Sequence, residues 1–280
     1  MEEPALAPGS TLGHYRLGAP LGEGAAGLVF AATAEDGTTV ALKLLRPELA
    51  RDAVALARFA REARVASALT TAHLVPILEL GESDGFTFLV QPCFRGGSLS
   101  QRLRALGPLP VADVLDLAAQ LARGLDALHR ADILHRDVKP SNVLLDGEGA
   151  AALTDFGLAR AGDSTRLTAD GQILGTPHYL APELIEGAEA TRQSDLYALG
   201  CVLYECVAGG PPFAGSRPAE IGFAHLTEPP PDLRERRPEL TGELVHALLS
   251  ALEKDPAARP TTATAYARML HLGRSGAGQR

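Results

Sequence analysis

The spacing of apolar residues changes once along the chain, near Gly97, and this change constrains the fold more than any other feature of the sequence. Between His14 and Gln91 the apolar residues form short runs, rich in valine, leucine and threonine and separated by glycine-containing turns. Such runs predict strands at 14–21, 27–34, 38–45, 76–81 and 86–91. In residues 53–69 the apolar positions instead follow helical spacing. The first part is therefore predicted to be a small antiparallel sheet with one helix.

Beyond Gly97 the apolar periodicity becomes helical. Helices are expected at 111–130, 193–208, 217–227, 241–253 and 262–271. The sequence thus predicts an α+β fold of two lobes, with an N-terminal lobe at 14–91, a hinge at 92–97 and a larger, mainly helical lobe at 98–272. Residues 1–13 and 273–280 are expected to be flexible tails.

Charge and hydropathy exclude two broad classes of protein. A formal net charge of −8 argues against non-specific nucleic-acid binding, which needs a basic face. The longest apolar stretch, 196–210, is interrupted by Glu205 and is too short to span a bilayer. We therefore expect a cytoplasmic protein, with membrane tethering only if the native chain extends beyond residue 280.

The run 135–142 (HRDVKPSN) places a carboxylate, an ammonium and a carboxamide within six residues, at Asp137, Lys139 and Asn142. Thirteen residues later a second carboxylate follows, Asp155, in a DFG sequence. Phosphoryl transfer needs this set of groups: an acceptor for the proton of the incoming hydroxyl, a cation for developing charge, and oxygen ligands for magnesium. A chance surface loop would not carry all these residue types in this order.

A glycine-rich segment, Gly22–Gly27, has the G-x-G-x-x-G spacing. Alone this spacing is a weak signal, since dinucleotide-binding folds share it and an ordinary hairpin turn can carry it. Here it joins two predicted strands, where glycines let backbone N–H groups approach phosphate oxygens without Cβ clashes. No G-x-x-x-x-G-K-[ST] sequence is present, which excludes a P-loop NTPase.

Lys43 lies among apolar residues in a predicted strand, and burial of an ammonium is costly unless the charge is paired. Nucleotide phosphates and Glu62 are the candidate partners, since Glu62 shares a helical face with Phe59 and Ala66. A snorkelling lysine and a solvated glutamate are the alternatives. The glycine-rich segment beside them favours the ion pair.

Taken together, these motifs resemble the catalytic domain of bacterial, eukaryotic-like serine/threonine protein kinases over about residues 14–271. The resemblance implies the two-lobed protein kinase fold. It also implies catalytic roles for Asp137, Lys139, Lys43 and Glu62, with Asn142 and Asp155 as ligands of Mg²⁺, for which Mn²⁺ could substitute. The implied ATP contacts are Leu21, Gly22, Glu23, Gly24, Ala25, Gly27, Val29, Ala41, Lys43, Gln91, Pro92, Phe94, Asn142, Leu144 and Asp155.

The resemblance further implies a substrate class and a mode of regulation. Lys139-Pro140 and the later GTP and APE sequences resemble the serine/threonine pattern, so Ser and Thr hydroxyls of proteins are the expected acceptors. The segment 158–180 carries Thr168 and Thr165, and we expect autophosphorylation at Thr168 or Thr165, with Arg136 as the phosphate receptor.

Three positions in the larger lobe are implied to be structural. Asp195 would cap the helix 193–208 and hold the backbone of the catalytic loop, and Glu183 would form a buried ion pair with Arg259. His135 and Phe156 are expected to pack rather than react.

Two other functions remain open from the sequence: a pseudokinase scaffold and a small-molecule phosphotransferase of related fold. A pseudokinase usually lacks a metal-binding or lysine residue, and none is missing here. The complete GTP and APE segment, which builds a peptide-docking surface, argues against the small-molecule enzyme. Protein substrates and the chain itself are the expected partners, a homodimer is left open, and neither nucleic acid nor a membrane segment is expected.

Overall fold

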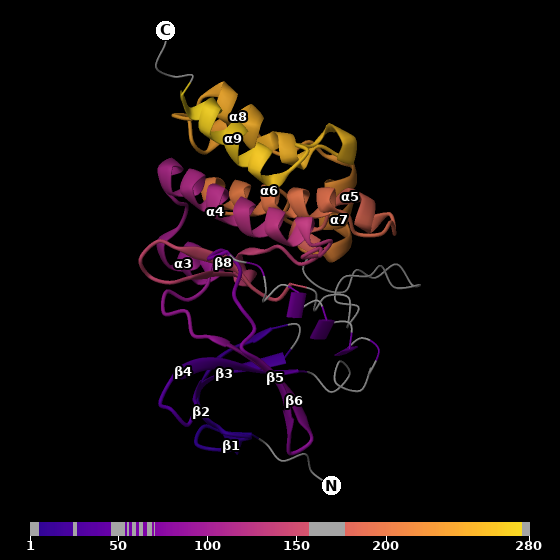
Figure 1. The fold of residues 1–280 in the computed structure, drawn as a ribbon. Helices are drawn as coiled ribbons and strands as arrows, with labels where there is room; N and C mark the ends of the chain where they lie inside the picture. Colours follow the sequence, from indigo (N-terminus) through magenta and orange to yellow (C-terminus); the bar gives the residue numbers. More distant parts are fainter. Residues whose placement is uncertain are drawn as a thin grey trace.

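The computed structural model describes residues 6–24, 27–45, 71–156 and 177–275, and between them positions 54, 56, 57, 60, 61, 64, 65 and 69. These residues form two lobes, with a β-sheet in the N-terminal part and helices stacked in the C-terminal part (Figure 1). The predicted α+β, two-lobed fold is confirmed.

The small lobe is built on an antiparallel six-stranded sheet in the order β1-β2-β3-β4-β6-β5. Its strands are β1 (Thr11–Leu12), β2 (Tyr15–Gly24), β3 (Gly27–Thr33), β4 (Thr39–Leu45), β5 (Glu79–Ser83) and β6 (Phe86–Pro92). One face carries the buried cluster of the lobe, with Leu17, Phe30, Leu42 and Phe88 among its members. Successive side chains of a strand alternate between the faces, so the opposite face, toward the large lobe, is left for other residues.

The five expected strands are present with shifted ends, and β1 is an addition. Of the expected helix 53–69, only scattered positions are described, and those from 54 to 65 are helical. Leu12 in β1 is fully buried, and at the other end of the chain Gly273 packs against the helix that begins at Gly242. These inner parts of the expected tails therefore belong to the folded structure, because their side chains or backbone have partners in the core.

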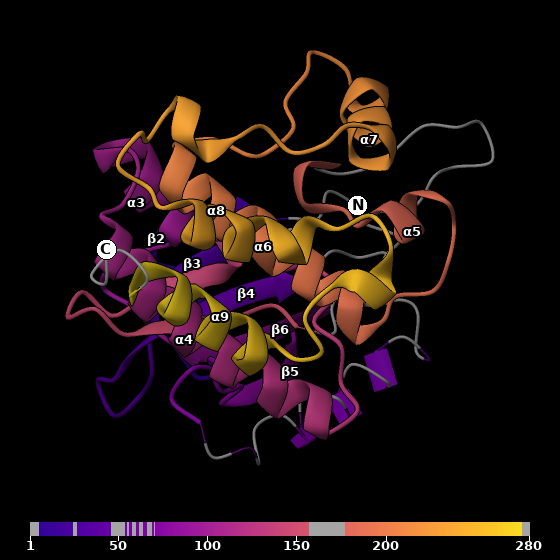
Figure 2. The same cartoon turned by 90° about the horizontal axis from the view of Figure 1, so that it is seen from above.

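The long helices of the large lobe are stacked in layers (Figure 1), and Figure 2 shows these layers from above. Its helices are α3 (Leu99–Leu106), α4 (Val111–Arg130), α5 (Pro182–Ile185), α6 (Arg192–Ala208), α7 (Pro218–Thr227), α8 (Gly242–Leu249) and α9 (Ala263–Ser275). Helix α6 is buried on nearly all sides, which is expected of a central helix that is apolar all round. The helix expected at 241–253 ends at Leu249 and continues as a 3-10 turn at Ser250–Leu252.

A short hairpin, β7 (Val143–Leu145) and β8 (Ala151–Leu153), lies where the two lobes meet. The segment that leads into β5 pairs with β8, since Val75 N–H donates to Leu153 O at 2.9 Å and Leu153 N–H donates to His73 O at 3.0 Å. Gly124 in α4 allows this approach, because a Cβ there would lie 2.5 Å from His73 O. The hairpin is thus fixed between the small lobe and α4.

Candidate active site

The expected catalytic loop, residues 135–142, is held in place by one buried carboxylate, Asp195 of α6. Its Oδ2 accepts the backbone N–H of His135 at 2.9 Å, and its Oδ1 accepts that of Arg136 at 2.8 Å. Arg136 has φ +67°, a left-handed conformation that costs free energy in a non-glycine residue. Two charge-assisted hydrogen bonds on adjacent amides offset this cost. They also fix the position of the next residue, Asp137.

His129 is a third partner of Asp195, and sequence reasoning missed it. Its Nε2 lies 2.8 Å from Asp195 Oδ2, and both side chains are buried. The sequence did contain a sign that His129 is buried, because it follows Leu125 by four residues and so shares the buried face of α4. The prediction that Asp195 caps α6 was wrong: Thr191 is the N-cap, and its side chain accepts the N–H of Ser194 in a capping box.

Asp137, Lys139 and Asn142 contact one another within the loop. Lys139 Nζ lies 2.7 Å from Asp137 Oδ2, and Asn142 Nδ2 donates to the same oxygen at 2.9 Å and to Asp137 O at 2.8 Å. Asp137 Oδ1 has no hydrogen-bond partner among the described residues. The Asp137 carboxylate is therefore held through Oδ2, and Oδ1 can accept a hydrogen bond from another group.

Asp155 joins the loop to the small lobe. Lys43 Nζ of β4 donates to Asp155 Oδ2 at 2.6 Å, and the Lys43 side chain is buried. Just before Asp155, Thr154 N–H donates to Asn142 O at 3.0 Å. Asp155 has φ +65°, the second left-handed non-glycine residue of the site. The backbone of Thr154 thus connects the Lys43–Asp155 pair to Asn142, which in turn contacts Asp137.

The sheet face toward the large lobe carries several of the expected nucleotide contacts. In the antiparallel register Val29 lies opposite Lys43, and Ala41 lies opposite Gln91. Directly opposed residues share a face, as do residues two apart in a strand, so all four lie on the side away from the buried cluster. The Gln91 side chain is buried, and its Oε1 accepts from Thr154 Oγ1 at 3.2 Å. This contact ties the end of β6 to the segment that bears Asp155.

The other expected nucleotide contacts either lie around this face of the sheet or fall on residues that the structure does not describe. Leu21, Gly22 and Glu23 lie exposed at the end of β2, and Pro92, Phe94 and Leu144 are half-buried near the hinge. The predictions that involve Ala25, Glu62, Thr165 and Thr168 fall outside the described residues.

His135 and Phe156 pack, as expected from the sequence. Both side chains are buried, with their rings edge to face at 6.4 Å. Burial lowers the pKa of His135, so its imidazole is held neutral within the core. Because the His135 side chain has no exposed surface, it cannot contact a substrate hydroxyl.

The donor set of the site fits a divalent cation. Asn142 uses both amide hydrogens on Asp137, and among the described residues its carbonyl oxygen accepts only from the Ser141 hydroxyl, at 3.5 Å. Asp155 adds a carboxylate, and hard oxygen ligands of this kind suit Mg²⁺. In the described part of the chain, no group of three or more His, Cys, Asp or Glu side chains could hold a metal. Mg²⁺ needs no such group, since it commonly takes one or two protein ligands and completes its shell with phosphates and water.

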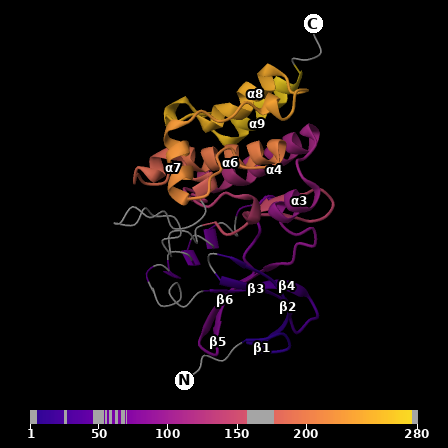
Figure 3. The ribbon, with the colours of Figure 1, turned by 180° about the vertical axis from the view of Figure 1, so that it is seen from behind.

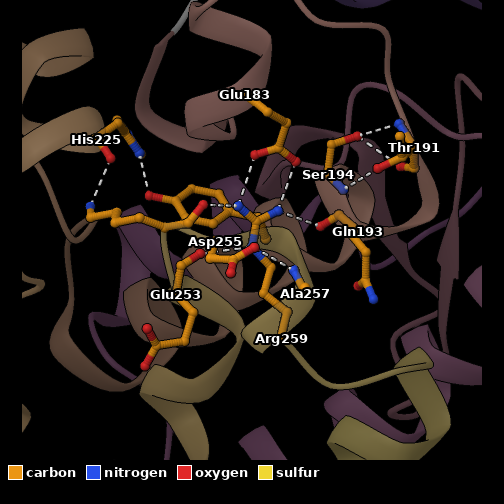
Figure 4. A network of polar contacts seen from close by, with 11 residues as sticks. Glu183, Thr191, Gln193, Ser194, His225, Glu253, Asp255, Ala257 and Arg259 are labelled. Carbon is orange, nitrogen blue, oxygen red and sulfur yellow. Dashed lines mark hydrogen bonds and ion pairs between the residues drawn. The ribbon is translucent and has the colours of Figure 1, made fainter.

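The predicted ion pair between Glu183 and Arg259 is present in the large lobe (Figure 4). Arg259 Nη1 and Nη2 donate to the two Glu183 oxygens at 2.7 and 2.8 Å. Its other three N–H groups reach backbone carbonyls, at Glu253, Gln193 and Lys254. All five donors of this buried guanidinium are therefore satisfied, and the pair is a structural element apart from the chemical groups.

Comparison with known proteins supports the resemblance seen in the sequence. The protein kinase domain family matches residues 15–270. Serine/threonine-protein kinase PknD of Mycobacterium tuberculosis is 40% identical over 267 residues, covering 94% of this chain and 40% of the relative. PrkC of Bacillus subtilis is 37% identical over 254 residues, covering 90% and 39%. The DNA damage-responsive kinase RqkA of Deinococcus radiodurans is 40% identical over 284 residues, covering 96% and 41%.

The fold also agrees with solved structures. A crystal structure of the Mycobacterium tuberculosis PknI kinase domain superposes with a TM-score of 0.77 and 31% identity, covering 96% of this chain and 99% of that one. The chain spans about two fifths of the length of the curated relatives it matches. From the family match over most of its length, the chain belongs to the protein kinase domain family.

Proposed function

We propose that the chain is a serine/threonine protein kinase that transfers the γ-phosphoryl group of ATP to Ser and Thr hydroxyls of proteins. The observation that carries this proposal is the series of contacts that joins the Lys43–Asp155 pair, through the backbone of Thr154, to Asn142 and Asp137. It brings a buried cation of the sheet and three polar groups of the large lobe to one place. Phosphoryl transfer depends mainly on such positioning and on charge stabilisation.

Each group of this set has a role in the proposal. Asp137 accepts the proton of the substrate hydroxyl through Oδ1 and orients its oxygen toward the γ-phosphate. Lys139 lies beside the same carboxylate and neutralises charge on the transferred group. Lys43 binds the phosphates further from the acceptor. Asn142 and Asp155 would hold Mg²⁺, or Mn²⁺ in its place, and a bound ion would neutralise charge between the phosphates.

The face that carries Val29, Ala41 and Gln91 would receive the adenine, together with Leu21, Phe94 and Leu144. We propose that residues 14–91 are the ATP-binding lobe, 92–97 the hinge and 98–272 the lobe that takes the protein substrate. The described part of the chain has no helix long and apolar enough to cross a membrane. We further propose a cytoplasmic location and autophosphorylation at Thr168 or Thr165.

A transfer assay tests the proposed function. Wild type and Asp155→Asn are incubated with labelled ATP and Mg²⁺, once with a generic protein substrate and once with small-molecule alcohols. We expect label on Ser and Thr residues of the protein, and none with Asp155→Asn, which keeps the side-chain shape but weakens the metal site. Mass spectrometry of the same wild-type sample should find phosphate on Thr168 or Thr165.

Other outcomes of this assay would replace the proposal. ATP binding without transfer in the wild type would indicate a scaffold, and label on the small molecules alone would indicate a small-molecule phosphotransferase.

A further inference from the structure

Lysine is rare in this chain, and its positions are Lys43, Lys139 and Lys254, while all the other residues among the 26 lysines and arginines are arginines. Lys43 and Lys139 belong to the proposed active site, where each contacts a carboxylate, at 2.6 and 2.7 Å. Lys254 lies in the large lobe, after the 3-10 turn at Ser250–Leu252. It is therefore the one lysine that the proposed phosphoryl transfer does not use.

The Lys254 ammonium binds the backbone of helix α7. Its Nζ donates to His225 O at 2.7 Å and to Ala224 O at 3.4 Å, both in the last turn of that helix. The same Nζ lies over the ring of Phe213, 4.4 Å from its centroid. Figure 4 shows His225, whose Nδ1 also lies 2.8 Å from the hydroxyl of Tyr197. Two carbonyls and an aromatic face thus surround the ammonium, and no described residue forms an ion pair with it.

Helix α7 is held to the lobe by few contacts. It lies at the margin of the large lobe (Figure 3). Its buried apolar residues pack in a small cluster, separate from the main core, that consists of Phe213, Ile221 and Ala224. Because this cluster is small, the hydrogen bonds from Lys254 are a large part of what holds the last turn of α7.

The surroundings of Lys254 disfavour its charged form. The titratable and charged groups around it are Cys201, His225, Glu228, Glu253 and Arg259. Burial lowers the pKa of Lys254 to about 8, and the two glutamates and Cys201 oppose this shift only in part. Cys201 and His225 are neutral near pH 7, because burial raises the pKa of the thiol and lowers that of the imidazole to about 3. At pH 7 about a tenth of Lys254 is then the free amine, whereas an exposed lysine has almost none.

The amine is within reach of small molecules. Lys254 is half-buried, and its chain neighbours Glu253 and Asp255 are exposed. A free amine keeps two N–H groups, which can serve the two α7 carbonyls, and it has a lone pair that can attack an electrophile. Partial exposure and the lack of a counter-charge therefore distinguish Lys254 from Lys43 and Lys139.

We infer that Lys254 is a site of covalent acylation by small acyl phosphates, and that this modification loosens α7 from the large lobe. The Lys254 nitrogen attacks the acyl carbon, so that an N–C bond forms and the C–O bond to phosphate breaks. Phosphate leaves with the bonding electron pair, and the nitrogen loses one proton to the solvent. The inference does not depend on the proposed kinase activity.

The product of this reaction is a neutral amide with a single N–H. It can donate to Ala224 O or to His225 O but not to both, and it places no charge over the Phe213 ring. The last turn of α7 should therefore open more often than in the unmodified chain.

Acetyl phosphate is the probe for the modification. The chain is incubated with it at pH 7 and at pH 9, and mass spectrometry follows acetylation at Lys254 and at an exposed amine introduced by Leu272→Lys, since Leu272 is 74% exposed. At pH 7 we expect Lys254 to react at least about threefold faster than the exposed amine, because more of it is deprotonated. Between pH 7 and pH 9 its rate should rise only about tenfold, against about a hundredfold for the exposed amine.

Hydrogen exchange tests the effect on α7. Lys254→Gln stands in for the acetylated side chain, and Lys254→Arg keeps a cation that can donate to both carbonyls. The amides of α7 should exchange at least about tenfold faster in Lys254→Gln than in the wild type, and within about twofold of the wild type in Lys254→Arg. The amides of α4, which belongs to the main core, should exchange equally in all three.

Several outcomes would overturn the inference. Lys254 could stay unmodified, react no faster than the exposed amine at pH 7, or show a rise of about a hundredfold between the two pH values. Equal exchange of the α7 amides in Lys254→Gln and the wild type would overturn the proposed loosening. Neither measurement needs phosphoryl transfer, so both can be interpreted even if the chain transfers no phosphate.

Discussion

Replacement of Asp137 with alanine is expected to lower kcat for protein phosphorylation by about 10²–10⁴-fold, the usual contribution of a positioned proton acceptor. The variant has no group to accept the hydroxyl proton or to orient its oxygen, and Lys139 and Asn142 both lose their shared partner. Lys43 and Asp155 keep their contact, so the KM for ATP should change little. Steady-state kinetics with varied ATP and a saturating protein substrate measures both constants.

The variant Asp137→Asn provides the matched control for structure. It keeps the size of the side chain and an oxygen to which Lys139 can donate, but the neutral amide is a poor proton acceptor. A loss of kcat close to that of Asp137→Ala would assign the effect to chemistry rather than to collapse of the loop. If Asp137→Asn instead stays within about tenfold of wild type, the carboxylate has no role as proton acceptor.

Replacement of Arg259 with methionine is expected to lower the free energy of unfolding by about 3–5 kcal/mol. The Arg259 side chain is fully buried, and its removal leaves the Glu183 carboxylate without its cation and removes three hydrogen bonds to backbone carbonyls. A buried charge that loses its partner keeps the cost of desolvation, which is why the expected effect is large. Urea unfolding followed by far-UV circular dichroism is the measurement, since the chain contains no tryptophan.

An exposed pair of the same chemistry serves as the control. Arg217 contacts Glu220 at 2.7 Å, but its side chain is 76% exposed. We expect Arg217→Met to change stability by only about 0–1 kcal/mol. Arg259→Lys should be intermediate, because one ammonium cannot replace five donors in a planar arrangement. Equal small losses for Arg259→Met and Arg217→Met would contradict the structural role given to the buried pair.

The long elements of the fold could be predicted from the sequence because their apolar pattern is long. The prediction for α4 matches its observed bounds, 111–130, because buried positions recur at helical spacing over about five turns. Helix α3 was missed because only Leu99 and Leu103 of its eight residues are buried. Its capping box, Ser98 with Gln101, was nevertheless a readable signal. The three-residue strands β7 and β8 are too short to show any periodicity.

The residues of the candidate site could be proposed from the sequence, but most of the contacts between them could not. Motif spacing predicted Asp137, Asn142 and Asp155 as site residues, because phosphoryl transfer needs those groups. The pairing of Lys43 with Asp155 joins positions 112 residues apart and depends on how the lobes meet. The contact of Gln91 with Thr154 is of the same kind, and no local pattern of sequence encodes it.

The most direct test of the proposed site is a crystal structure of the chain with a non-hydrolysable ATP analogue and Mn²⁺, whose anomalous scattering locates the metal. We predict Mn²⁺ coordinated by the Asp155 carboxylate and the Asn142 carbonyl oxygen, with Lys43 on the phosphates and the γ-phosphate facing Asp137. A nucleotide bound elsewhere, or a metal with neither Asp155 nor Asn142 among its ligands, would contradict the proposed site.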